Sequence, residues 1–342
     1  MTAGTSLPSD FSPLPQVLLA HMSKRFVERS LEYGSLLGPV GSESPIWIED
    51  NPWFVNGGQY IQAPYVKRIP GLTRRDITST GALTAQKVEG GNNQGVLLNR
   101  RSELMKFTDA TWIRNMPREQ ISAELGRQLG ELVLDDLLST AIAALRGMVE
   151  AVAEHISDVW VTSGTKQLIT PAQIDAGRDL MGDAWSVLTH MLLHSSCNTD
   201  LRSDAVGRGY DTVGGATLKG DPNANGFGLK KVIRDDANLA VADAGFDKRL
   251  VFLLGRGVLM IGFEKQYMVE TDRNLANENK ETLWRADGEL KLRSNHMSYN
   301  DGAGGANPSN SVLADSANWT DGYENHKEFP AVELVLNATA AN

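Results

Sequence analysis

Apolar residues recur at three- and four-residue steps along residues 117–155, with charged residues between them. The series consists of Ile121, Leu125, Leu129, Leu132, Val133, Leu137, Ile142, Leu145, Val149 and Val152. This spacing draws one apolar stripe down an α-helix, and Pro117 suits the first turn of that helix. Such a helix would be roughly 55 Å long, which is more than an ordinary globular domain needs. The pattern therefore predicts a long strut in an extended protein.

Three glycines interrupt this predicted helix. Gly126, Gly130 and Gly147 each lower the helix propensity of the segment. The charged residues beside the stripe also lack the regular e/g pattern of a coiled coil. A coiled coil is therefore the weaker interpretation of the stripe.

The chain before this helix begins with a polar, proline-rich stretch over residues 1–15, which we expect to be flexible. Residues 16–37 then show a modest amphipathic periodicity, with basic residues between the apolar ones. A helix of this length is marginal by itself and must pack on another element. Because no adjacent segment supplies a partner, we expect an arm that lies across a neighbouring subunit, rather than a core element of its own domain.

Helical periodicity disappears between residues 46 and 109. Residues 59–66 and 95–100 have the composition of strands, and glycine, threonine and asparagine fill the space between them. A segment with so few large apolar residues cannot bury much of itself. It is therefore either disordered or a projecting hairpin that packs on other chains, and we favour the hairpin.

Shorter elements follow the long helix. Thr170 can cap a helix that Pro171 begins, and Gln173 can complete a capping box, so a helix is expected to run to about residue 181. Strands are expected at residues 159–161 and 231–235, at 251–263 as two strands divided at 255–257, at 281–293 as a strand pair, and at 331–336. Short helices are expected at residues 195–204 and 309–319, loops at 207–228 and 299–306, and either a strand or a helix at 185–193. This mixed order, without an internal repeat, predicts an α+β fold.

Composition and charge narrow the class of protein. The chain has 342 residues, of which 41% are hydrophobic, enough for a well-formed core and two domains. Its net charge of -9 argues against binding nucleic acid through an overall basic surface, although local contacts to DNA stay open. The single cysteine, Cys197, excludes an internal disulfide and fits assembly in a reducing cytoplasm. Neither a membrane span nor a secretory signal is expected from the apolar pattern.

Two histidines form a candidate metal site. His190 and His194 stand four residues apart, a spacing that on a helix places both imidazoles on one face and that zinc sites use. Met191 occupies the place where a metalloprotease motif has glutamate. On a strand the two side chains would share a face but lie too far apart to bind one ion easily. We therefore expect structural histidines, and a metal-dependent enzyme is the less favoured alternative.

Gly255 and Gly257, with Gly262, suggest a phosphate-binding turn. They lack the G-x-G-x-x-G spacing, and apolar residues rather than an amphipathic helix follow them. A tight turn between two buried strands explains the glycines equally simply. We expect the turn.

The remaining polar candidates also have simple explanations. Cys197 lies near His194 in sequence, but sequence neighbours are seldom the partners of a catalytic triad, and no G-x-S-x-G elbow is present. The pairs Arg74–Arg75 and Arg100–Arg101 could contact phosphates or acidic neighbours, or lie on solvated loops. We expect no catalytic, cofactor-binding or metal-binding residues, no cofactor, and a protein that is not an enzyme.

Several short motifs occur in a fixed order between about residues 85 and 337. They are Leu192-Leu193-His194-Ser195-Ser196 followed by Leu201, then Gly255-Arg256-Gly257, Glu270-Thr271-Asp272-Arg273-Asn274, Asn307-Pro308-Ser309-Asn310-Ser311-Val312-Leu313-Ala314 through Asn318-Trp319, and Phe329-Pro330-Ala331-Val332. Together with the order of arm, β loop, long helix and mixed body, they resemble the major capsid proteins of tailed bacteriophages, which have the Hong Kong 97-type fold. The fourth motif departs from the family wording at Ser309, Ser311 and Val312.

The resemblance implies a division of the chain into functional parts. These are an N-terminal arm at residues 1–54, an extended loop at 55–112 that reaches over a neighbouring subunit, a spine helix with the peripheral domain at 113–165, an axial domain at 166–328, and a C-terminal strand at 329–342 that returns to the peripheral domain.

The resemblance also implies a function. Copies of the chain would self-assemble into pentamers and hexamers of an icosahedral head that encloses double-stranded DNA, located in the virion after assembly in the host cytoplasm. The implied partners are the chain itself, a portal at one vertex and the packaged DNA. A separate scaffolding protein is also expected, since the short arm leaves no room for a built-in scaffold. A decoration protein is left open, and no membrane is involved. An encapsulin-type compartment that holds a cargo enzyme is the alternative within the fold, and the wording of residues 307–319 favours the virus.

Overall fold

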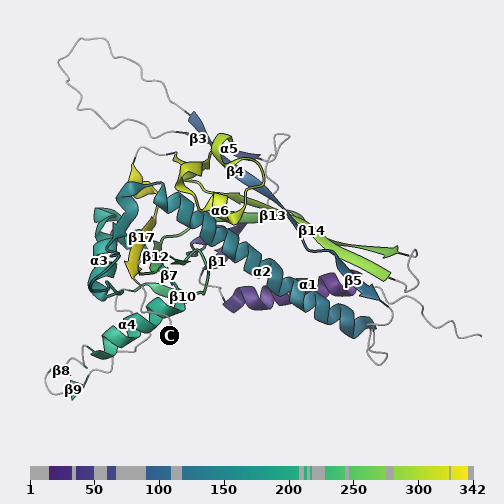
Figure 1. Ribbon diagram of the computed structural model, residues 1–342. Coiled ribbons are helices and arrows are strands. Elements are labelled where there is room, and N and C mark those ends of the chain that lie inside the picture. The colour runs from purple at the N-terminus through teal and green to yellow at the C-terminus, as the bar shows by residue number, and fades with distance from the viewer. Residues whose placement is uncertain are drawn as a thin grey trace, which may run out of the picture.

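The computed structural model describes residues 15–32, 36–49, 60–66, 90–108, 118–207, 212–213, 216–217, 228–242, 246–274, 281–322 and 325–337. Its helices are α1 (Pro15–Glu32), α2 (Arg118–Glu150), α3 (Pro171–Asp179), α4 (Ser195–Gly207), α5 (Asp301–Gly304) and α6 (Asn310–Leu313), with 3₁₀ helices η1 (Ala153–His155), η2 (Gly182–Val187), η3 (Ser316–Asn318) and η4 (His326–Glu328). Figure 1 shows α2 running across the body, with α1 beside its first half and with α3 and α4 at the other end. None of these helices is long and apolar enough to cross a membrane.

Two sheets form most of the body. The larger has seven strands in the order β1-β2-β13-β14-β4-β3, with β5 also paired to β14; its strands are β1 (Leu37–Pro39), β2 (Ile46–Glu49), β3 (Tyr60–Val66), β4 (Gly90–Arg101), β5 (Met105–Thr108), β13 (Leu259–Asn274) and β14 (Glu281–Arg293). The other has six strands in the order β10-β7-β12-β17-β6, with β11 paired to β12; its strands are β6 (Ile156–Asp158), β7 (His190–Leu193), β10 (Lys230–Ile233), β11 (Ala240–Val241), β12 (Lys248–Leu254) and β17 (Ala331–Asn337). Two small sheets pair β15 (Met297–Tyr299) with β16 (Trp319–Asp321) and β8 (Thr212–Val213) with β9 (Ala216–Thr217).

Helix α2 is the long amphipathic helix that the apolar pattern predicts. It has 33 residues and is therefore about 50 Å long. Its buried side chains from Leu134 to Val149 join one core with residues from both large sheets. The helix ends at Glu150, earlier than the predicted residue 155, since the chain turns at Ala151 and η1 then carries His155 into a fully buried position.

Two of the glycines in α2 allow other elements to approach its backbone. A Cβ atom at Gly130 would lie 2.6 Å from the carbonyl oxygen of Met22 on α1. A Cβ atom at Gly147 would lie 2.7 Å from the indole nitrogen of Trp319. The low helix propensity at these positions is thus offset by close packing.

A second core lies on the other face of the six-stranded sheet. Side chains alternate along the strands, so that Phe252 faces the α2 core while Leu253 faces the second one. Helix α3 covers this face, and Gly177 lets it pack directly on Leu334. The predicted capping box of α3 is confirmed, because Thr170 and Gln173 each accept a hydrogen bond from the backbone nitrogen of the other.

The glycine pair at residues 255–257 forms the predicted tight turn, but its two strands belong to different sheets. Strand β12 enters the turn from the six-stranded sheet, and β13 leaves it in the seven-stranded sheet. Gly257 has a φ of 63°, and a Cβ atom there would lie 2.7 Å from the ring of Trp47. Glycine is therefore required by both backbone conformation and space.

Two predicted strand assignments are wrong. Residues 281–293 form the single strand β14 instead of a strand pair, because Asp287 and Gly288 stay in register with Arg101 and Arg100 of β4. The strand predicted at residues 159–161 lies three residues earlier, as β6. Trp160 follows β6, and its indole nitrogen donates to the carbonyl oxygen of Phe246 at 2.8 Å.

Other predictions are confirmed with changed limits. The segment 309–319 is two short helices, α6 and η3, because Asp315 accepts a hydrogen bond from the backbone nitrogen of Ala317 and starts a new turn. The ambiguous segment 185–193 contains both a 3₁₀ helix, η2, and the strand β7. The expected loop at 299–306 contains the helical turn α5.

The predicted hairpin at residues 59–66 and 95–100 is present as the antiparallel pair β3 and β4. The expectation that this segment cannot bury itself is wrong for β4, since Val96 and Leu98 are fully buried and β4 pairs with β14 on its other side. The parts of the expected loop at residues 55–59, 67–89 and 109–112 lie outside the described residues.

Candidate functional site

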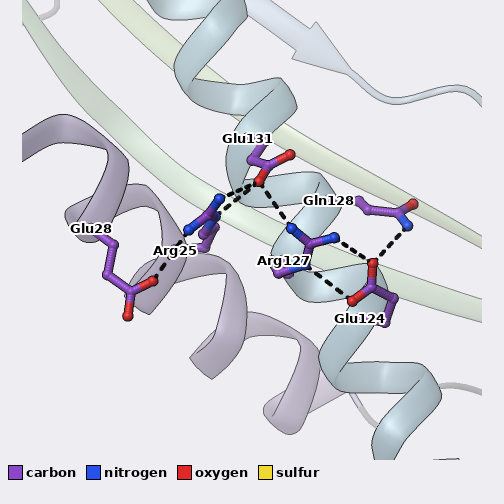
Figure 2. Close-up of polar contacts among 6 residues, drawn as sticks. All are labelled: Arg25, Glu28, Glu124, Arg127, Gln128 and Glu131. Atoms are coloured by element: carbon purple, nitrogen blue, oxygen red, sulfur yellow. Dashed lines mark hydrogen bonds and ion pairs between the residues drawn. The ribbon is translucent and has the colours of Figure 1, made fainter. Parts of the chain in front are cut away.

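Helix α1 packs on the first half of α2 through a charged cluster (Figure 2). Arg25 donates to Oε1 of Glu131 from Nε at 2.9 Å and from Nη2 at 2.7 Å. Glu131 also accepts a hydrogen bond from Arg127 at 3.2 Å, and Arg127 donates to Glu124 at 2.7 Å. Beside this cluster, the ring of Phe26 meets an aromatic ring of β13 edge-on.

These contacts correct the expectation that the N-terminal helix has no partner in its own chain. The partner, Glu131, stands 106 residues further along, so the adjacent sequence could not reveal it. The hydrogen bond to Glu131 raises the pKa of Arg25, and those from Arg127 and Gln128 lower the pKa of Glu124 to about 2. Both ion pairs are therefore charged across the physiological pH range. Contact of this helix with a neighbouring subunit stays a prediction.

A groove of about 800 Å³ opens where α2 passes the end of β10. We call it the acidic groove; it is lined by Leu132, Asp135, Asp136, Ser139, Ile233, Arg234, Asp235, Asp236, Ala237 and Asn310. Arg234 pairs with Asp135 at 3.4 Å and with Asp236 at 3.8 Å. Arg100 pairs with a second lining carboxylate, that of Asp136, so the lining keeps a net negative charge. Its exposed carboxylates are Asp135 and Asp235, and the apolar side chains of Leu132 and Ile233 remain exposed beside them.

The described arginine pair at residues 100–101 contacts acidic groups of its own chain. Arg100 reaches α2, where it pairs with Asp136 at 3.0 Å and donates to Thr140 at 2.7 Å. Arg101 pairs with Asp287 of β14 at 3.0 Å, at the wall of a second cavity of about 500 Å³. These ion pairs fix β4 against α2 and β14. Arg74–Arg75 lies outside the described residues.

The structure separates the roles of the two candidate histidines. His190 is buried on β7, and its Nδ1 lies 2.8 Å from the hydroxyl of Thr189. His194 follows β7; its Nδ1 lies 2.9 Å from the hydroxyl of Ser196 and its Nε2 3.3 Å from Asp235. Burial lowers the pKa of His194 despite Asp235, so the ring is mostly neutral at pH 7. Across the described ranges, no group of three His, Cys, Asp or Glu residues could hold a metal ion.

Cys197 is a buried residue of the second core. Burial raises the pKa of its thiol to about 12, which leaves almost no thiolate at neutral pH. A thiol in that state is a poor nucleophile and a poor metal ligand. Its role is packing against neighbours such as Leu193 and Leu201.

Titratable groups that sequence reasoning missed are buried near the start of β17. Glu333 is 1% exposed, its carboxylate oxygens have no hydrogen-bond partner among the described residues, and burial raises its pKa to about 8. His155 stacks on Phe329 at 5.9 Å between ring centroids, and burial lowers its pKa to about 4. Burial likewise lowers the pKa of His296 to about 4. No signal in the sequence could locate them, since each is buried by elements from distant segments.

The arrangement of these residues defines a class of protein. Among the described residues, Arg25 and Arg100 form ion pairs within the chain and Cys197 packs in the core, whereas the surface carries grooves and exposed apolar side chains. The fold matches solved capsid structures. The match to the capsid of cyanophage Pam1 has a TM-score of 0.55 and 13% sequence identity, and it covers 100% of this chain and 99% of the other. The match to the capsid of Ralstonia phage GP4 has a TM-score of 0.56 and 10% sequence identity, and it covers 100% of this chain and 96% of the other. The head of Helicobacter pylori bacteriophage KHP40 matches with a TM-score of 0.51 and 10% identity, covering 90% of each chain. The fold is therefore the Hong Kong 97-type fold of phage shell proteins, as the resemblance in sequence predicts.

The family follows from the sequence itself. The model of the Gp13-like family, described as major capsid protein 13-like, matches residues 46–332, and the chain belongs to this family. No curated protein matches the chain. The protein is thus a major capsid protein of a tailed-phage head, a structural component of the virion and not an enzyme. The match to a viral family also favours the virus over the encapsulin-type alternative.

Proposed function

We propose that copies of this chain assemble into pentamers and hexamers, and that these form an icosahedral head around double-stranded DNA. The observation that supports the proposal most directly is the family match over residues 46–332. Closed shells need contacts that repeat from copy to copy, and the exposed apolar side chains Val27, Leu104, Leu132, Trp185 and Met268 offer surface for them.

The charge of the chain fits containment of DNA without tight binding. With a net charge of -9, the protein repels the phosphate backbone on average. Packaged DNA would then contact the inner wall locally and stay mobile against it. A strongly basic wall would instead hold the DNA through released counterions.

The division of the chain is part of the same proposal. The arm (1–54) and the extended loop (55–112) lie over neighbouring subunits, the spine helix and peripheral domain (113–165) frame each subunit, and the axial domain (166–328) meets its copies at the symmetry axes. The strand at 329–342 closes the peripheral domain. A scaffolding protein, a portal at one vertex and packaged DNA are the other proposed partners; a decoration protein is left open.

Electron microscopy of the purified protein, with size-exclusion chromatography beside it, tests this proposal. We expect closed shells, capsomer rings or tubes, because large burial among many copies favours assembly by mass action. Nucleic acid inside shells from phage-infected cells would support a genome container, and a packaged enzyme would support the compartment instead. A chain that stays monomeric even when it is produced together with the other head proteins would overturn the proposal.

A further inference from the structure

Two surfaces beside the six-stranded sheet expose apolar side chains, one among acidic residues and the other among basic ones. The first is the acidic groove, where Leu132 is 59% exposed and Ile233 is 41% exposed. Apolar side chains of this size favour burial over contact with water. Of the rim carboxylates, Asp135 and Asp235 are the most exposed, so the groove presents apolar surface within a negative rim.

The second surface lies on η2 and the adjacent turn; we call it the Trp185 patch. Trp185 is 48% exposed and Val187 is 40% exposed. The guanidinium of Arg178 stacks over the indole of Trp185, 4.4 Å from the ring centroid. Arg256, at the turn between β12 and β13, is exposed, and its neighbour Gly255 lies against the carbonyl oxygen of Val187. An exposed Trp–Arg pair of this kind is the combination that dominates binding energy in protein interfaces.

The topology places the two surfaces at opposite ends of the same sheet. Strands β7 and β10 are parallel and in register from His190 and Lys230 to Leu193 and Ile233. The Trp185 patch comes just before the start of β7, whereas the groove residues 233–237 come at the end of β10. Helix α2 lies on one face of the sheet and α3, which supplies Arg178, on the other. The patch therefore cannot reach the groove of its own chain.

We infer that the Trp185 patch of one copy docks in the acidic groove of the next copy, with Arg178 and Arg256 facing Asp135 and Asp235. The inference rests on the proposed self-assembly and names the surfaces that perform it. Because the two surfaces differ and lie apart, each contact leaves one free patch and one free groove. Such a head-to-tail contact propagates around a ring and closes when the rotation between copies allows it.

Cysteine crosslinking tests the contact with small substitutions. Ser186→Cys lies on the Trp185 patch and Ala237→Cys in the acidic groove, and both residues are exposed. The natural Cys197 is 1% exposed and should not react. Assembled particles carrying both substitutions are treated with a short bis-maleimide and run on a denaturing gel. The matched control combines Ala237→Cys with Thr320→Cys, an exposed position on β16 outside both surfaces.

We expect a ladder of dimers, trimers and larger products from the variant with both cysteines, and monomers from each single variant and from the control. Adding Trp185→Ala to the double variant should reduce crosslinked product by about tenfold, as for loss of an interface anchor. Dimers from a single variant would mean that like surfaces meet and would overturn the inference. Monomers alone from well-formed particles of the double variant would overturn it too, while leaving the proposed function intact. A wild-type chain that forms no particle even when it is produced together with the other head proteins would overturn the proposed function first.

Discussion

Glu333 lies on an inner strand of the six-stranded sheet, on β17 between β12 and β6. Its neighbours include the ion pair of Arg146 and Glu150, which are 2.7 Å apart at the end of α2. Burial is the main cause that raises its pKa to about 8, and Glu150 adds to the effect while Arg146 opposes it. At neutral pH the group is therefore mostly protonated in the folded chain.

This carboxyl should make the protein less stable as the pH rises. Between pH 4.5, the ordinary pKa, and about pH 8, the folded state keeps a proton on Glu333 that the unfolded state releases. The contribution of this proton to the stability of the folded state is therefore complete below pH 4.5 and is lost as the pH rises to about 8. We expect Glu333→Gln to match the wild type at pH 5 and to exceed its free energy of unfolding by on the order of 4 kcal/mol at pH 9. Urea denaturation at both pH values measures the difference. Glu103→Gln, at an exposed position, serves as the control for replacing a glutamate by glutamine. Equal effects of both substitutions would contradict the prediction.

At the scale of secondary-structure elements, Gly147 sets how closely the C-terminal segments approach α2. A Cβ atom there would overlap the carbonyl oxygen of Leu313 and the indole of Trp319. At an unconstrained helix position, glycine to alanine stabilises by up to about 1 kcal/mol. Here we expect Gly147→Ala to destabilise the protein by about 1–3 kcal/mol, since α6 and β16, which carry Leu313 and Trp319, must move. Urea midpoints test the sign, with the exposed Gln120→Ala as a control that should change stability by less than about 0.5 kcal/mol.

The charged cluster of Figure 2 anchors α1 to α2. Glu131 accepts hydrogen bonds from both Arg25 and Arg127, so its carboxylate is the acceptor that links α1 to α2 in this cluster. We expect Glu131→Gln to increase hydrogen exchange in α1 while leaving the exchange of the buried second half of α2 unchanged. Mass spectrometry of exchanged peptides measures both regions. Lys24→Ala, which removes an ion pair 3.9 Å long and largely exposed, is the control and should leave α1 protected.

Elements whose signals are local were predictable from the sequence. The stripe of α2, the capping box at Thr170 and the glycine turn at residues 255–257 each depend on residues a few positions apart, and each is present. The strand pair expected at 281–293 failed because Asp287 and Gly288 suit turns locally, yet pairing with β4 holds them extended. The partner of α1 was likewise missed because the contact joins residues that are far apart in the sequence, Arg25 and Glu131.

At the scale of the whole molecule, the family could be recognised from ordered motifs, whereas the interaction surfaces could not. The acidic groove combines α2, the segment after β10 and Asn310, which are brought together by the fold alone. Its exposed Leu132 belonged to the same apolar series as buried Leu129 and Val133, so periodicity predicted burial where the structure leaves a surface. Periodicity tells which residues share a face of the helix, but the exposure of Leu132 depends on which elements pack on that face in the folded molecule.

In a head that holds packaged DNA, as proposed above, the turn at residues 255–257 would also have a mechanical consequence. It joins β13, half of the long β13–β14 hairpin that extends from the body in Figure 1, to β12, which has neighbours on both sides in the other sheet. With Gly257 fixed against Trp47, the connection has little slack. A force that pulls on the hairpin is therefore transmitted to β12, an interior strand of the six-stranded sheet. There the hydrogen bonds to β7 on one side and to β17 on the other share the force. An edge strand, with hydrogen bonds on one side alone, would separate from its sheet more easily. A force applied to the projecting β13–β14 hairpin would thus be resisted by the hydrogen bonds of β12 inside the body of the subunit.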